Sequence, residues 1–229
     1  TGYKIPVISG FGSTEAGPSA MFANWAGGFS GLLGIPVAGM DMKLVPNGDK
    51  LQAAYKAPNL TKGYYKDLKA NNTAFDSEGY FLTGDAVRFL DQAKPDKGLV
   101  FDGRITEDFK LATGTWVNVG VLRSRALKLG APVIQDIVFT GINEDYIAAI
   151  IFLNDQAFID LQQERNIFLE SWLQAFNETA SGSSTFIKKY LVANEPLSIA
   201  LGELTDKGSV NQRAVLQNRK ALIQKLYTS

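Results

Sequence analysis

Two residue types that carry much of enzyme chemistry are missing from this chain of 229 residues, which has no cysteine and no histidine. The lack of cysteine excludes disulfide bonds, thiolate zinc sites and cysteine nucleophiles. The lack of histidine excludes a Ser-His-Asp triad and any imidazole acid-base step by this chain. Its chemistry must therefore use carboxylates, lysine, arginine, hydroxyls or backbone groups, a set suited to stabilising charge and positioning a substrate.

An excess charge of either sign is also missing, because 23 basic and 23 acidic side chains give a formal net charge of zero. This balance offers no electrostatic footprint for nucleic acid or an anionic membrane. No apolar run approaches the ~20 residues that span a bilayer. The hydrophobic fraction of 45% suits a globular core. We therefore expect a cytoplasmic protein with no nucleic-acid partner and no membrane span.

The first half of the chain is predicted to consist mostly of strands and turns, with a Gly-rich loop at 9–18. A hairpin is expected around Pro46-Asn47-Gly48-Asp49. The expected strands cover 5–9, 40–45, 51–56, 79–90 with an interruption at 83–84, and 99–101; a loop is expected at 24–39 and a short helix before residue 75.

The second half changes character after residue 103 and alternates helices with strands. Helices are expected at 121–129, 155–165, 167–179, 185–192 and 211–227, and strands at 116–119, 133–141, 146–153 and 197–201. The fold class is therefore α+β, with a β-rich domain over 1–103 and a small α+β domain over 104–229.

The stretch Ser9–Pro18 has the composition of a phosphate and metal cradle. Its glycines let backbone N–H groups approach a ligand, and Ser13 and Thr14 add hydroxyl donors. Glu15 adds a carboxylate oxygen of the kind that Mg²⁺ prefers. A Gly/Ser turn with a solvated glutamate is the structural alternative.

Two downstream motifs place charge beside glycine. In Thr83-Gly84-Asp85 the carboxylate follows a glycine within a strand, where it could accept hydrogen bonds from a vicinal diol such as ribose, or merely end the strand. In the segment 102–110, Arg104 lies among charges of both signs where the composition shifts. That segment is either a solvated linker or a hinge whose arginine touches the ligand.

In this order, the three motifs resemble those of the adenylate-forming acyl-CoA synthetase superfamily, the AMP-binding enzymes. The matching segments are Phe11–Glu15, Thr83–Asp85 and Gly103–Lys110. Within the superfamily, residues 107–120 and 204–213 look most like feruloyl-CoA synthases, and long-chain fatty-acyl-CoA ligases come next. The resemblance implies a distorted-barrel subdomain, mainly β, followed by a mobile small domain.

The resemblance also implies an ATP-dependent carboxylic acid:CoA ligase, in which an acyl-adenylate forms, the small domain rotates, and the coenzyme A thiol displaces AMP. Catalytic roles fall on Thr14 (phosphate), Glu15 (Mg²⁺) and Lys207 (adenylation). Contacts with ATP or AMP fall on Phe11, Gly12, Ser13, Asp85 and Arg104, with the last two at the ribose, whereas Gly114 to Trp116 border the pantetheine channel.

Three positions depart from the superfamily pattern. Phe11 replaces the usual tyrosine, and Thr106 stands where the hinge usually has aspartate or lysine, so the pivot is Thr106 or Glu107. Near the C-terminus the adenylation lysine usually follows a glycine. Here Ser209 follows Gly208, and Lys207 precedes it. A displacement of one residue can disrupt catalytic geometry, and Lys207 could equally be a solvated turn lysine.

The superfamily's phosphate loop and most of its acyl pocket have no counterpart here, so the chain resembles the C-terminal part of a longer enzyme. We expect the chain alone to be inactive and its partners to be an aromatic or fatty acid, ATP, coenzyme A and an N-terminal remainder. The alternatives are a non-catalytic nucleotide-binding or interaction module, and the adenylation part of a long-chain acyl-CoA ligase or a carboxylic acid reductase.

Overall fold

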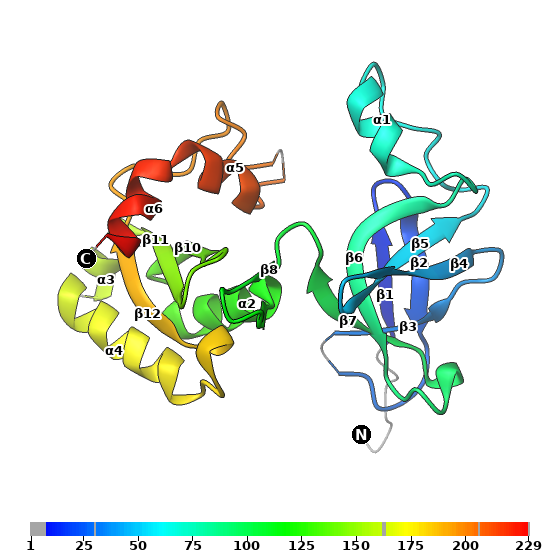
Figure 1. Cartoon of the computed structure of the whole chain (residues 1–229). Helices are drawn as coiled ribbons and strands as arrows, with labels where there is room; N and C mark the ends of the chain where they lie inside the picture. Colours follow the sequence, from blue (N-terminus) through cyan, green and yellow to red (C-terminus); the bar gives the residue numbers. More distant parts are fainter. Residues whose placement is uncertain (1–7, 30, 162–163, 206, 229) are drawn as a thin grey trace. The chain divides into compact units, whose positions relative to one another are not determined.

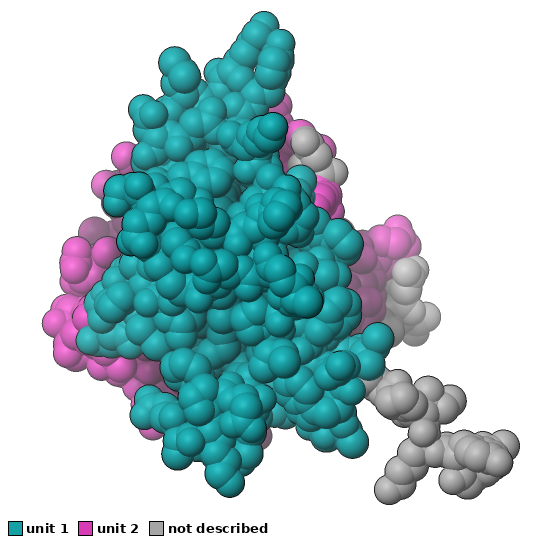
Figure 2. Space-filling view, turned by 90° about the vertical axis from the view of Figure 1, so that its right-hand side faces the viewer, with its two compact units in different colours: residues 1–105 teal, residues 106–229 magenta. Residues whose placement is uncertain are grey.

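The computed structural model describes residues 8–29, 31–161, 164–205 and 207–228. The chain divides into two compact units, Thr1–Ile105 and Thr106–Ser229, which are coloured separately in Figure 2. Arg104 thus belongs to the first unit, at the end of its last strand.

The first unit is built on one antiparallel sheet in the order β1-β2-β3-β7-β6-β5-β4 (Figure 1). Its elements are β1 (Ser9–Ser13), β2 (Gly17–Ala23), β3 (Leu32–Pro36), β4 (Asp41–Asn47), β5 (Lys50–Lys56), α1 (Leu68–Ala74), β6 (Phe81–Phe89), the 3₁₀ turn η1 (Pro95–Lys97) and β7 (Leu99–Arg104). The large sheet with few helices confirms the predicted α+β class.

Side chains from every strand of this sheet meet in one hydrophobic core, so the sheet must curl around them. The core includes Phe11, Met21, Leu33, Met42, Tyr55, Val87 and Leu99, which come from β1 to β7 in turn. Across this core, the rings of Phe11 and Phe101 lie 6.3 Å apart. Strands β1 and β4 form the two ends of the pairing order among the described residues, so the barrel stays open.

The Gly-rich stretch that was predicted to be a loop is a β-hairpin instead. Strands β1 and β2 pair closely, and a Cβ on Gly12 would lie 2.4 Å from the carbonyl oxygen of Gly17. Glycine is required there by close approach of two strands, a reason that composition alone does not reveal. The strand predicted at 5–9 lies mostly outside the described residues.

The loop predicted at 24–39 also contains a strand, β3. Gly34 in this strand has a φ of 87°, and a Cβ there would lie 1.9 Å from the carbonyl oxygen of Phe22. The glycines that suggested a loop thus allow β3 to pair with β2. The hairpin around Asn47 and Gly48 is confirmed as β4 and β5.

In the second unit, helices cover both faces of a three-stranded sheet. Its elements are β8 (Phe109–Lys110), β9 (Trp116–Val117), α2 (Val119–Gly130), β10 (Ile134–Thr140), β11 (Ile147–Leu153), α3 (Asp155–Leu161), α4 (Arg165–Glu178), η2 (Ser183–Thr185), β12 (Ile187–Val192), α5 (Gln212–Asn218) and α6 (Lys220–Tyr227). Helices α2 and α4 pack on one face of sheet β10-β11-β12 through Leu122, Trp172 and Phe176, and α5 and α6 pack on the other through Val215 and Leu226.

Three predictions in this unit were wrong. Residues 185–192 are not a helix but include strand β12, which pairs in parallel with β11 and buries side chains against both helix layers. The lysines at 188 and 189 had broken the alternation expected of a strand. The segment 197–201 is irregular, and the C-terminal helix is divided at Arg219.

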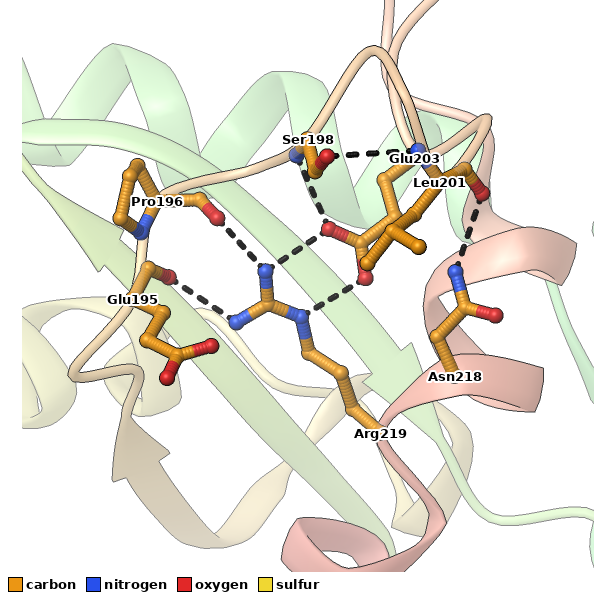
Figure 3. A network of polar contacts seen from close by, with 7 residues as sticks. All are labelled: Glu195, Pro196, Ser198, Leu201, Glu203, Asn218 and Arg219. Carbon is orange, nitrogen blue, oxygen red and sulfur yellow. Dashed lines mark hydrogen bonds and ion pairs between the residues drawn. The ribbon is translucent and has the colours of Figure 1, made fainter.

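A buried ion pair explains both the irregular segment and the divided helix (Figure 3). The guanidinium of Arg219 donates to both carboxylate oxygens of Glu203, at 2.9 and 2.7 Å, and to the carbonyl oxygens of Glu195 and Pro196. Glu203 is 1% exposed and also accepts a bond from the N–H of Ser198. The segment 195–203 is therefore folded around a charged side chain and needs no strand partner.

We expect Arg219→Met to destabilise the second unit by about 3–5 kcal/mol, because the buried Glu203 carboxylate would lose its counter-charge. Urea unfolding monitored by fluorescence and circular dichroism measures this loss. The control Arg213→Met removes an exposed arginine from α5. Equal losses in the two variants would contradict the assignment.

The same pair predicts an acid sensitivity. The hydrogen bonds from Arg219 hold the pKa of Glu203 below its ordinary value of 4.5. A depressed carboxylate pKa adds stability that is complete above the unfolded-state pKa and is lost as pH falls through the folded-state pKa. We therefore expect the stability difference between the natural chain and Arg219→Met to shrink below pH 4.5. A difference that stayed constant down to pH 2.5 would oppose this prediction.

Candidate functional site

The first predicted motif lies at the tip of the β1–β2 hairpin. Phe11, Gly12 and Ser13 are in β1, and the turn that follows consists of Thr14, Glu15 and Ala16. Thr14 is exposed and Glu15 is half-buried. The motif therefore presents a hydroxyl and a carboxylate on a rigid turn, not within a flexible loop.

A segment that sequence reasoning missed holds this turn in place. The hydroxyl of Tyr64 donates to Oε1 of Glu15 at 2.8 Å, and the N–H of Thr61 donates to the Glu15 carbonyl at 2.7 Å. Nδ2 of Asn59 donates to the carbonyl of Ala16 at 2.6 Å. Because these donors are more than 40 residues away in sequence, only the fold could reveal them.

The electrostatics of this turn favour an ionised Glu15. Partial burial opposes ionisation, but hydrogen bonds from Tyr64, the Glu15 backbone and Ser13, with the charge of Arg104, outweigh it and hold the pKa of Glu15 below 4.5. Burial and the same hydrogen bond raise the pKa of Tyr64 to about 12, so it remains a donor. The carboxylate is thus available to a cation.

Glu15 fits Mg²⁺ only as one ligand among several. The described residues contain no group of three or more Asp, Glu, His or Cys side chains able to hold a metal ion. Mg²⁺ is often bound by one or two carboxylates together with substrate phosphates and water. A single ionised glutamate therefore suits a metal that arrives with a phosphorylated substrate.

The second motif forms a bulge in strand β6. Ala53 of β5 lies opposite three residues, Thr83, Gly84 and Asp85, where the β5–β6 register shifts. The hydroxyl of Thr83 donates to the carbonyl of Ala53 at 2.7 Å and accepts from the N–H of Asp85 at 3.0 Å. Gly84 has a φ of 74°, which a side chain would strain. The bulge redirects the Asp85 side chain.

Asp85 and Arg104 form an ion pair of unequal exposure. They are direct partners in the β6–β7 ladder, and Nε of Arg104 lies 3.2 Å from Oδ1 of Asp85. The Asp85 side chain is 6% exposed, whereas that of Arg104 is 56% exposed. An arginine that is exposed in this way can hydrogen-bond a ligand while it contacts the buried acid.

Tyr55 is a second residue that sequence reasoning missed. It is 1% exposed, and burial together with the charge of Asp85 raises the pKa of its phenol well above 10.0. Tyr55 lies in β5, within the apolar segment predicted as a strand, so its place near Asp85 had no signal in the sequence. The buried phenol thus lies within the electrostatic influence of Asp85.

The remaining predicted residues lie in the second unit. Gly114 is in the exposed turn between β8 and β9, with a φ of 80°. The ammonium group of Lys110 lies over the ring of Trp116, in β9, at 5.0 Å from the ring centre. Lys207 is exposed on a turn whose ends are joined by a bridge between Leu204 and Val210.

The predicted hinge residues lie at the start of the second unit. Thr106 is exposed, and the carbonyl of Glu107 accepts a hydrogen bond from Nε2 of Gln212 at 3.2 Å. Gln212 was not predicted as a site residue, and it is 2% exposed. The structure thus brings the Glu15 turn and the Asp85–Arg104 pair into the first unit, and the Lys110–Trp116 hairpin and Lys207 turn into the second.

No helix within the described ranges is long and apolar enough to cross a membrane.

Two relatives resemble this chain in sequence along almost its whole length. Relatives from Arabidopsis thaliana include a probable acyl-activating enzyme 16, chloroplastic, which is 24% identical over 97% of this chain and 34% of its own length. A chloroplastic long-chain-fatty-acid–[acyl-carrier-protein] ligase is 24% identical over 96% of this chain and 32% of its own length. The chain therefore spans about a third of the length of these relatives.

Solved structures agree with the fold. The adenylation domain of a carboxylate reductase from Mycobacterium chelonae superposes with a TM-score of 0.74 and 20% identity, over 97% of this chain and 35% of that one. The didomain of the carboxylic acid reductase from Segniliparus rugosus, solved with AMP, gives a TM-score of 0.71 and 21% identity, over 96% and 31%.

The family is shown by a match that covers more than half of the chain. Residues 110–229 match the AMP-binding enzyme C-terminal domain. This range contains β9, the covered sheet and the Lys207 turn, and it begins within β8. The chain therefore belongs to the AMP-binding enzymes that carry this C-terminal domain.

Proposed function

We propose that the chain is the C-terminal portion of an ATP-dependent carboxylic acid:CoA ligase that acts through an acyl-adenylate. The observation that carries this proposal is the Asp85–Arg104 pair, a buried carboxylate beside an exposed guanidinium on two neighbouring strands. A carboxylate can accept both hydroxyl donors of a ribose, and the guanidinium can donate to the same sugar. This pair would hold AMP by its ribose.

In this proposal the β1–β2 turn binds the phosphates. Thr14 would donate its hydroxyl to phosphate, with Ser13 beside it, and Phe11 and Gly12 would lie toward adenine. Tyr64 would hold Glu15 in position through its hydrogen bond. Mg²⁺ bound at Glu15 would neutralise phosphate charge as the acid attacks the α-phosphate.

The second unit would supply the moving parts. The domain boundary expected from the sequence, between 103 and 104, lies two residues before the boundary between the compact units, between 105 and 106. Lys207 would stabilise charge at phosphorus, since its exposed turn can approach a ligand. Rotation at Thr106 or Glu107 would then bring Gly114 and Trp116 to the pantetheine channel, where the coenzyme A thiol displaces AMP. The acid pocket and phosphate loop would come from an N-terminal remainder of the same enzyme, and the location would be cytoplasmic.

The acid is proposed to be aromatic, as in feruloyl-CoA synthases, on the likeness of residues 107–120 and 204–213 to that group. A long-chain fatty acid is the second candidate, because a relative with 24% identity over 96% of the chain is a long-chain-fatty-acid–[acyl-carrier-protein] ligase. A third candidate is the adenylation part of a carboxylic acid reductase, as in a relative that is 23% identical over 98% of the chain.

A non-catalytic nucleotide-binding module is the alternative from another class. Ser209 at the usual lysine position supports it, whereas the paired Asp85 and Arg104 oppose it.

We expect Asp85→Asn to weaken AMP binding about tenfold or more, because a hydrogen bond to a charged group contributes roughly 1.5–3 kcal/mol. Binding of 2′,3′-dideoxy-AMP should not change, since it lacks the diol. Isothermal titration of the 229-residue chain measures both, and Asp91→Asn, on the turn after β6, is the matched control.

An equal loss of affinity for both nucleotides would show that Asp85 does not bind the ribose hydroxyls. A non-catalytic module with a decayed site should bind neither AMP nor a non-hydrolysable acyl-adenylate mimic, and that result would overturn the proposed function.

We expect the chain alone to catalyse no acid-dependent exchange of pyrophosphate into ATP, because the phosphates would be held on one side only. Radiolabelled pyrophosphate with ferulate or palmitate provides the assay. Exchange above the level of a Glu15→Gln control would contradict this expectation.

A further inference from the structure

The linker between the two units has a fixed point on each side of one residue. The N–H of Ile105 donates to the carbonyl of Gly84 at 2.9 Å, within the first unit. The carbonyl of Glu107 accepts from Nε2 of Gln212 at 3.2 Å, within the second unit. Thr106, between them, is exposed. Torsional freedom is therefore concentrated at Thr106 and the bonds beside it.

Gln212 is an unusual residue to find in this position. It is 2% exposed, and its Oε1 is buried without a hydrogen-bond partner. The orientation of the amide is settled by chemistry, since only its nitrogen can donate to the Glu107 carbonyl. An unsatisfied buried acceptor destabilises the folded chain. A residue present for packing alone would be apolar, so the amide itself has a role.

The place of Gln212 in the chain connects the linker with the Lys207 turn. It is the first residue of α5, and only Asn211 separates it from the Val210 end of that turn. The N–H of Asn211 donates to the Glu203 carbonyl at 2.8 Å, which closes the base of the turn. Glu203 is in turn held by Arg219. A displacement of the Glu107 peptide would therefore act on the base of the Lys207 turn through one side chain.

We propose that Gln212 is a positioning residue that anchors Glu107, confines the pivot to Thr106 and couples the linker to the Lys207 turn. The Oε1 atom of Gln212, which has no hydrogen-bond partner, can serve a second state of the linker. If the peptide between Glu107 and Asp108 turns over, an N–H replaces the carbonyl, and Oε1 accepts it. Glutamine thus serves two settings of the linker, because it is both donor and acceptor. The catalytic relevance of this coupling rests on the proposed function, but the anchoring does not.

Hydrogen exchange with mass spectrometry on the full chain tests the anchor. In Gln212→Met, exchange of amides in 105–109, 203–205 and 207–211 should rise about fivefold, because a hydrogen bond of about 1 kcal/mol is lost. Sheet β10-β11-β12 should be unchanged, since the variant also removes the unsatisfied acceptor. The matched control is Gln224→Met on the exposed side of α6.

Two results would overturn the proposal: unchanged exchange in 105–109, or a rise that is equal throughout the second unit, which indicates a merely structural role. No nucleotide is used, so failure of the AMP experiment would leave this test intact.

A second measurement decides the matter if Gln212→Met does not fold. The chain has no cysteine, so Lys94→Cys and Lys128→Cys introduce one dye site in each unit. Thr106→Gly should widen the distribution of energy-transfer distances, because glycine enlarges torsional freedom at the pivot. Glu107→Gly, one residue further along the linker, should leave it nearly unchanged, because Gln212 still holds the carbonyl of residue 107. Equal widths for both variants would overturn confinement at Thr106.

Discussion

The candidate site depends on one buried carboxylate of the first unit, Asp85, and on its ion pair with Arg104. Asp85 is nearly buried, and a buried charge is tolerated only when it is paired and hydrogen-bonded. The β6 bulge orients it, the adjoining strand supplies Arg104, and the curled sheet closes around the apolar side. Arg104 is also the last residue of β7, directly before Ile105, with which the first unit ends.

Much of the fold could be predicted because its signals were local. Asn47 and Gly48 marked a hairpin, and two apolar runs on either side of a polar turn marked β10 and β11. Glycine misled where its purpose was close approach, at Gly12 and Gly34, since a residue that permits a turn also permits strands to touch. Strand β12 was missed because neighbours covering both faces, not its own pattern, determine its state.

The residues of the candidate site also fall into those with a local signal in the sequence and those without one. Glu15, Asp85 and Arg104 belong to short ordered motifs that are visible in the sequence. Tyr64, Tyr55 and Gln212 are not, because each acts on a residue that is distant in the chain, through a hydrogen bond or a field. Such supporting residues are fixed by topology. Their side chains are common ones, and their roles follow from the residues that the fold places beside them.

The four bonds of Arg219 bear on how the C-terminal region can vary. The guanidinium contacts two carboxylate oxygens and two backbone carbonyls, a pattern that a planar fork can match and an ammonium cannot. The segment 195–203 is thus held by the planar shape of the guanidinium as well as by its charge. An exchange of Arg219 for lysine would therefore keep the charge but lose the fit to the segment 195–203.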